Sequence, residues 1–122
     1  MIKVTLSYSD FQGASTTKSV TARTLPSNRS LFSVIIKHTT AFAGSGLSAI
    51  TISLGITGDL TKFINNFNIL QAVSSSAQDS AITIYFPGVA TPIIATVTAT
   101  GANTSALNAG SVDIYFNEVV TS

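Results

Sequence analysis

The single histidine and the five carboxylates are the side chains in this sequence that could carry acid–base or metal chemistry. His38 follows the apolar positions Val34 and Ile36 near the carboxyl end of an expected strand. A Ser-His-acid set would need a serine and a carboxylate beside its ring, and the sequence has no Gly-x-Ser-x-Gly turn to present such a serine. We interpret His38 as a structural or interface residue and predict that the protein is not an enzyme.

Carboxylates can surround a metal ion, but the acidic residues here are isolated from one another along the chain. The Asp-x-Asp spacing of a calcium loop does not occur. With one histidine and no cysteine, a zinc site would need several carboxylate or water ligands. We expect no metal and no cofactor. The acidic residues are Asp10, Asp59, Asp79, Asp113 and Glu118.

Aromatic residues outside the apolar pattern are candidates for contact with a partner. Tyr85 and Tyr115 lie out of phase with the apolar positions of their expected strands, so we expect both at the surface. An exposed tyrosine can stack on a sugar or anchor a protein interface. Phe42 precedes the glycine-rich residues 44–46 and fits either a buried end cap or an interface. The candidate interface residues are therefore Tyr85, Tyr115, Phe42 and His38.

The composition favours assembly with other proteins. Charged residues make up 9% of the 122 residues, against about 25% in an average soluble domain. The net charge is +1, and the chain contains 34 Ser and Thr residues. A surface with so few charges has little self-repulsion to keep copies apart. We expect such a surface to be covered by a partner.

Several partner classes are disfavoured by the same residues. The six basic residues are spread along the chain and form no patch for phosphates, so we expect no nucleic acid. No apolar run approaches the roughly 18 residues of a membrane span, so we expect no membrane. Residues 1–6 alternate apolar and polar, which predicts a strand and not a signal peptide.

The elements that must position these side chains are strands. Alternation of apolar and polar residues recurs in seven segments separated by Gly-, Pro- and Ser-rich turns. This pattern predicts an all-β fold, an antiparallel β-sandwich of jelly-roll-like form, as a single domain over residues 1–122. The expected strands lie within residues 2–8, 20–23, 33–37, 50–54, 82–86, 93–100 and 112–117.

One segment departs from the strand period. Leu60, Phe63, Ile64 and Phe67 have the spacing of one helix face, and Asp59 could cap the first turn. We therefore predict one short helix near residues 59–66, lying across an open end of the sandwich.

Two β-prone and weakly charged stretches raise the question of assembly. Residues 82–86 and 113–116 would pair without control if they lay on an open sheet edge. They must be central strands or be covered by a specific neighbour. We expect a closed homo-oligomer, with a trimer as the first candidate.

Two longer stretches resemble small virion structural proteins of tailed bacteriophages. The first is KHTTAFAG (residues 37–44) running on to ITISLG (50–55), and the second is ATVTATGAN (95–103) followed by LNAGSVDIYF (107–116). The resemblance implies a jelly-roll-like domain on the virion, as a head decoration or a tail accessory, contacting other virion proteins. The resemblance supplies no catalytic residues. The alternating residues 1–6 separately predict synthesis in the host cytoplasm.

Two alternatives remain open from the sequence. The first is a carbohydrate- or receptor-binding β-sandwich, which would use tyrosines and asparagines of the loops. The second is an enzyme, which would require His38 to lie within hydrogen-bond reach of an acid and a serine in a cleft.

Overall fold

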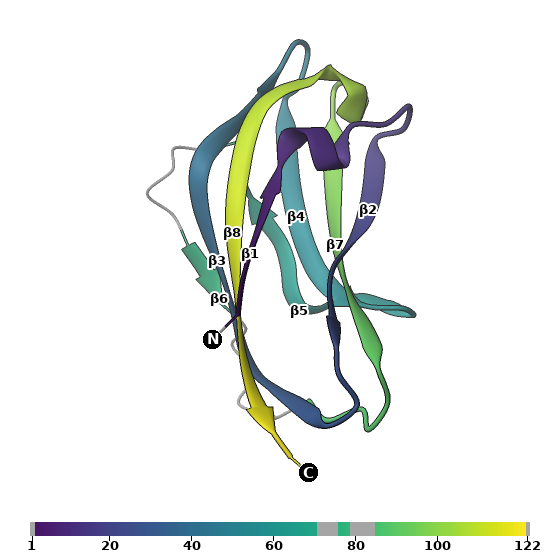
Figure 1. Ribbon diagram of the computed structural model, residues 1–122. Helices are drawn as coiled ribbons and strands as arrows, with labels where there is room; N and C mark the ends of the chain where they lie inside the picture. Colours follow the sequence, from purple (N-terminus) through teal and green to yellow (C-terminus); the bar gives the residue numbers. More distant parts are fainter. Residues whose placement is uncertain (1, 71–75, 79–84, 122) are drawn as a thin grey trace.

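Two four-stranded antiparallel sheets pack face to face in the computed structural model, which describes residues 2–70, 76–78 and 85–121 (Figure 1). Two short 3-10 helices accompany them, η1 (Tyr8–Phe11) and η2 (Thr104–Ala106). The strands are β1 (Ile2–Ser7), β2 (Thr17–Leu25), β3 (Arg29–Gly44), β4 (Ala49–Ile56), β5 (Asp59–Asn68), β6 (Ser76–Gln78), β7 (Thr91–Thr100) and β8 (Leu107–Val120).

The order of the strands is that of a jelly roll. One sheet has the order β1-β8-β3-β6 and the other has the order β2-β7-β4-β5. The first strand therefore pairs with the last, the second with the seventh, the third with the sixth and the fourth with the fifth. This is one long antiparallel hairpin rolled into two sheets. The predicted antiparallel, jelly-roll-like sandwich is confirmed.

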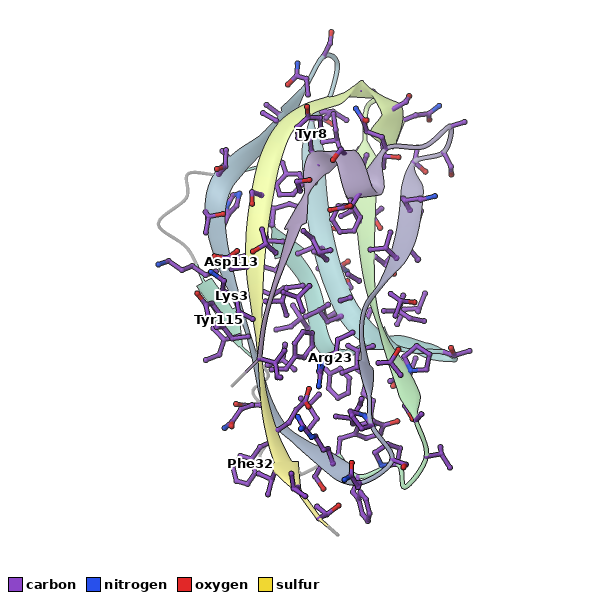
Figure 2. All side chains as sticks on the ribbon, in the orientation of Figure 1. Lys3, Tyr8, Arg23, Phe32, Asp113 and Tyr115 are labelled. Carbon is purple, nitrogen blue, oxygen red and sulfur yellow. The ribbon has the colours of Figure 1, made fainter. Side chains whose placement is uncertain are left out.

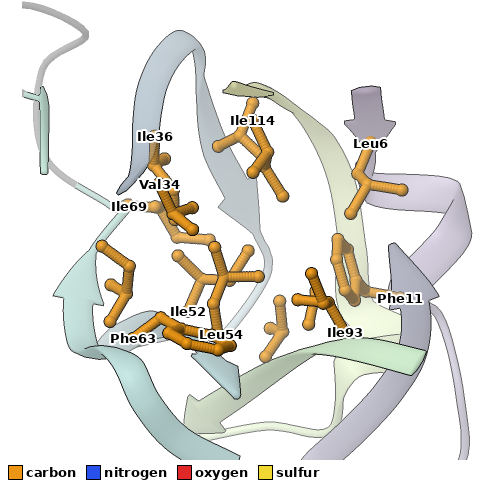
Figure 3. Packing of buried hydrophobic residues seen from close by; sticks show 14 of the residues in the cluster. Leu6, Phe11, Val34, Ile36, Ile52, Leu54, Phe63, Ile69, Ile93 and Ile114 are labelled. Carbon is orange, nitrogen blue, oxygen red and sulfur yellow. The ribbon is translucent and has the colours of Figure 1, made fainter. Parts of the chain in front are cut away.

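The core lies between the two sheets and follows the predicted alternation. Ile50, Ile52 and Leu54 of β4 point inward from one sheet. Ile114 and Phe116 of β8 point inward from the other. Figure 3 shows Ile52, Leu54 and Ile114 packed together between the sheets. All five side chains are fully buried, and each contributes about 1.5–3 kcal/mol of hydrophobic stabilisation. The core therefore joins strands that are far apart in the sequence.

The helix predicted for residues 59–66 is wrong, because these residues belong to β5, which pairs with β4. The pairing contains two register shifts, both opposite the part of β4 between Ile52 and Ile56. An irregularity of this kind interrupts the two-residue alternation of a strand. The adjacent residues Phe63 and Ile64 are consequently both buried. Bulges in a strand thus produced the three- and four-residue apolar spacing that resembles a helix face.

The strand predicted for residues 82–86 falls mostly outside the described residues. Its last part is described: Tyr85 forms an antiparallel bridge with Leu31 of β3. The Tyr85 N–H donates to the Leu31 carbonyl at 3.0 Å, and the Leu31 N–H donates to the Tyr85 carbonyl at 2.8 Å.

The connections gather at two opposite ends of the sandwich (Figure 1). One end, here named the C-terminal end, contains residues 26–28, 86–90 and 119–121. There the Thr121 N–H donates to the Asn28 carbonyl at 2.8 Å. The other end, here named the η2 end, contains residues 12–16, 45–48 and 101–106. Among the described residues, no helix is long and apolar enough to span a membrane.

Candidate functional site

Tyr115 lies on the outer face of the β1-β8-β3-β6 sheet, as its position out of phase with the core predicted. Its neighbours in the sheet are Lys3 of β1 and Ile35 of β3, and its side chain is half-buried. Two residues earlier, Asp113 accepts a hydrogen bond of 2.6 Å from the hydroxyl of Thr5. Figure 2 shows Tyr115, Asp113 and Lys3 close together on this face. The arrangement offers a partner an aromatic ring bordered by polar and charged groups.

Tyr85 is placed differently from the sequence prediction. Its ring packs edge-on against Phe63, with 5.4 Å between the ring centroids, and it borders the core. The Lys62 ammonium lies 5.2 Å from the centroid of the same ring. The next residue, Phe86, lies in phase with the apolar positions of the strand expected at residues 82–86, which predicts an inward side chain, but it is 56% exposed. Tyr85 thus borders the core and Phe86 is exposed, which is the reverse of the predicted alternation.

Phe42 is an end cap of the core. Its side chain is 1% exposed, and its ring lies 6.5 Å from that of Phe11 and 6.1 Å from that of His38. Gly110 of β8 lies directly against the ring. Of the two roles left open by the sequence, the structure places Phe42 in the buried one, so it does not reach the surface of the subunit.

His38 is also buried, and its surroundings are aromatic. The ring is 1% exposed and lies 6.5 Å from Phe67 in an edge-on arrangement. Among the described residues, neither ring nitrogen has a hydrogen-bond partner. Burial lowers the pKa of His38, and the nearby Thr40 backbone opposes this only in part. A His38-centred triad would need a serine and an acid at these nitrogens, and the described residues supply neither.

The buried histidine makes stability depend on pH. The pKa of His38 is lowered in the folded protein from its ordinary value of 6.5. Above pH 6.5 the ring is neutral in both the folded and unfolded chain, so it adds no pH dependence. As the pH falls below 6.5, the unfolded chain takes up a proton that the buried ring resists, and the folded state loses stability until the lowered pKa is reached.

We expect His38→Leu to keep its stability at about pH 7.5 and to lose the acid sensitivity that begins as the pH falls below about 6.5. Leucine is apolar and similar in volume, so it removes two unpaired buried nitrogens. Urea unfolding at several pH values measures the effect, with the exposed-site variant Thr39→Leu as the control. An unchanged pH profile in His38→Leu would contradict the assignment.

Two groups at the C-terminal end were missed by the sequence analysis. The first is a buried ion cluster in which Arg23 of β2 and Arg29 of β3 bind Glu118 of β8. The second is a set of exposed apolar side chains, of which Phe32 is an example. Phe32 shares the two-residue phase of the buried Val34, so alternation alone could not show that it is exposed.

An open hollow of about 700 Å³ lies on the outer face of the β2-β7-β4-β5 sheet, beside the β4–β5 turn. Its lining combines small polar groups with two aliphatic side chains and includes no aromatic ring, so it offers no stacking platform for a sugar. The lining residues are Ser19, Thr57, Gly58, Asp59, Leu60 and Ile94.

Comparison with known proteins gives one informative likeness. No protein-family model and no curated protein matches the sequence. Among solved structures, a chain of the cyanophage Pam1 capsid asymmetric unit is similar, with a TM-score of 0.65 and 18% sequence identity. The likeness covers 98% of this chain and 82% of that chain. At this identity the likeness concerns the fold, and it extends over nearly the whole of this jelly roll.

Proposed function

We propose that this protein is a non-enzymatic structural component of a tailed-phage virion, acting as a head decoration or a tail accessory protein. The observation that carries the proposal is the likeness of its fold, over 98% of the chain, to a chain of a cyanophage capsid asymmetric unit. The chain would act as one domain that associates with copies of itself and docks on the particle. Its place of action would be the virion.

The surface is consistent with such a role. With 9% charged residues, the protein has a weakly charged exterior of hydroxyl, amide and aliphatic groups. Tyr115 is the best-placed anchor of a subunit interface, because it is half-buried on an outer sheet face and bordered by Lys3 and Ile35. Tyr85 would take part through its accessible edge. Phe42 and His38 would act indirectly, by fixing β3 against the core.

The first test is whether the protein is present in particles. We expect mass spectrometry of gradient-purified phage particles to find the chain at a fixed number of copies per particle. Deleting the gene should lower particle yield or resistance to heat. Absence of the chain from purified particles would overturn the proposal.

The second test concerns self-association. We expect light scattering at micromolar concentration to give a closed oligomer, with a trimer as the first candidate. Tyr115→Ala should raise the dissociation constant by about tenfold or more, as for an interface anchor. Thr98→Ala, on the outer face of the other sheet, is the control. A wild-type monomer would contradict self-association and would favour the sugar- or receptor-binding alternative.

A further inference from the structure

Exposed apolar side chains are unevenly distributed over the molecule. Six large apolar side chains are exposed among the described residues, and five of them lie at the C-terminal end. Those five are between 46% and 63% exposed. Isolated exposed apolar residues are ordinary, whereas a group at one end indicates an interaction site. The five, here named the apolar patch, are Phe32, Phe86, Val89, Val119 and Val120.

Backbone pairing brings two members of the patch, Val119 and Phe86, to either side of β3. Ser30 is paired with Val119 on one side. Because Leu31 is bridged to Tyr85 in the antiparallel sense, Ser30 is followed on its other side by Phe86. Residues side by side on neighbouring strands point to the same face. The two exposed apolar side chains therefore flank the small Ser30, which is itself buried.

A β-bulge adds Phe32 to the patch. The register between β3 and β8 shifts between Leu31 and Ser33, so Phe32 is the extra residue. Bulges of this kind turn a side chain that alternation would direct into the core. Figure 2 shows Phe32 directed away from the sandwich beside the carboxyl end of β8. An outward phenylalanine at this position is a property of the tertiary pairing, and about half of its surface is left exposed by the subunit.

The charged groups at this end are partly paired, with two arginines sharing one carboxylate. Arg23 and Arg29 both bind Glu118, whose side chain is 2% exposed. Lys62 lies beside the patch, over the ring of Tyr85. Glu118 thus offsets one of the two guanidinium charges, and the Arg29 side chain remains a third exposed. The chemistry of this end favours an apolar protein surface as the partner.

The η2 end has the opposite character. Its exposed side chains are small and polar, and none of the exposed large apolar side chains of the described residues lies there. Examples are Ser45, Ser48, Asn103 and Ser105. The subunit therefore has one apolar end and one hydroxyl- and amide-rich end, and this polarity defines a direction along the strands.

The size of the patch decides between two occupants. Five half-exposed side chains amount to about 400 Å², which is about half of the roughly 800 Å² per partner that a stable interface buries. A second copy bound through this patch alone would dissociate. An oligomer of this protein would instead bind stably to a large surface that contacts the apolar patches of several subunits at once, because linked weak contacts give a higher overall affinity. In a cyclic oligomer, rotation about the axis leaves equivalent ends on the same side.

We propose that the apolar patch docks on an apolar, weakly charged surface of the phage shell and that the η2 end faces solvent. This inference rests on the proposed virion function and adds the docking end, the chemistry of the surface and the orientation. The subunits contact one another elsewhere, and the patch is left for the particle.

The absence of cysteine from the sequence makes a labelling test direct. Phe32→Cys and Val119→Cys report on the patch, and Ser45→Cys and Ser105→Cys report on the η2 end. In the free protein we expect a hydrophilic maleimide to label all four. On particles, the labelling rate at the two patch positions should fall by about tenfold or more, because the centre of a docked interface excludes water. The labelling rate at the two η2-end positions should stay unchanged.

Binding of the purified protein to particles lacking it gives an independent measurement. We expect Phe32→Ser combined with Phe86→Ser to weaken binding by about tenfold or more. Leu60→Ser is the matched control, because Leu60 is the exposed large apolar residue on a different face. Far-ultraviolet circular dichroism and thermal unfolding confirm that the variants are folded.

Each other outcome has a distinct meaning. If the η2-end cysteines were protected from maleimide on particles and the patch cysteines were labelled, the proposed orientation would be overturned and the proposed virion function would stand. Protection of the patch in the free oligomer would make it a subunit interface and overturn the inference. A chain absent from particles would overturn the proposed function, and the inference with it.

Discussion

Gly110→Ala is expected to destabilise the protein by about 3–5 kcal/mol. Two physical causes add. Gly110 has a φ of 136°, where a side chain is strained. A Cβ atom there would also overlap the ring of Phe42, which is 1% exposed and cannot move aside. The melting temperature should fall by about 10–20 °C.

Gly58→Ala is the matched control for this substitution. Gly58 also has a positive φ, 89°, but a Cβ atom there would meet nothing within 4 Å. It should therefore show the backbone strain without the collision, at a cost of about 1 kcal/mol. Adding Phe42→Leu to Gly110→Ala should restore part of the stability. Equal melting temperatures for the two alanine variants would show that the Phe42 ring does not lie on Gly110.

Glu118→Gln is expected to destabilise the protein by removing a buried carboxylate. Glu118 of β8 accepts hydrogen bonds from Arg23 of β2 through both carboxylate oxygens, so the ion pair connects the two sheets. Arg29 adds a third hydrogen bond at 3.2 Å. Without the carboxylate, two guanidinium groups face each other in a site where the acceptor was 2% exposed. We expect a loss of about 2–4 kcal/mol in urea unfolding.

The ion cluster also predicts a pH dependence distinct from that of His38. Burial by itself raises the pKa of Glu118, but hydrogen bonds from Arg23 and Arg29 outweigh it and hold the pKa below the ordinary 4.5. The stabilisation is therefore present above pH 4.5 and is lost as the pH falls through the lowered pKa. Glu118→Gln should lose this acid dependence while keeping the loss that begins at pH 6.5.

Two variants separate the charge effect from packing. Arg29→Gln should cost less than about 1 kcal/mol, because its side chain is a third exposed and water screens the pair. Arg23→Met combined with Glu118→Leu should recover much of the lost stability, since an apolar pair often replaces a buried ion pair without cost. Wild-type stability of Glu118→Gln at neutral pH would show that the cluster does not hold the sheets together.

The fold class and much of the core follow from local patterns in the sequence. Alternation in residues 50–54 and 112–117 placed Ile52 and Ile114 on the inner faces, where both are fully buried. The period of two is a local property of the extended chain, so it can be read wherever a strand is regular. The same reasoning placed Tyr115 on the outer face. These results depend on no contact between distant residues.

The tertiary structure alone decided the positions where strand pairing is irregular. The bulges opposite β4 turned an expected helix at residues 59–66 into β5. A bulge in β3 directed Phe32 outward, and the bridge to Leu31 exchanged the roles of Tyr85 and Phe86. A bulge depends on the register with a partner strand distant in sequence, and each shift of one residue moves side chains to the other face.

The ends of the sandwich show the same division. Nothing local relates Arg23 to Glu118, which are separated by 95 positions and meet because the rolled hairpin brings β2 and β8 together. The apolar patch likewise draws on three separate segments that only the jelly roll unites. A single sequence records which residues alternate, whereas the meeting of distant segments depends on the free energy of the whole packed chain.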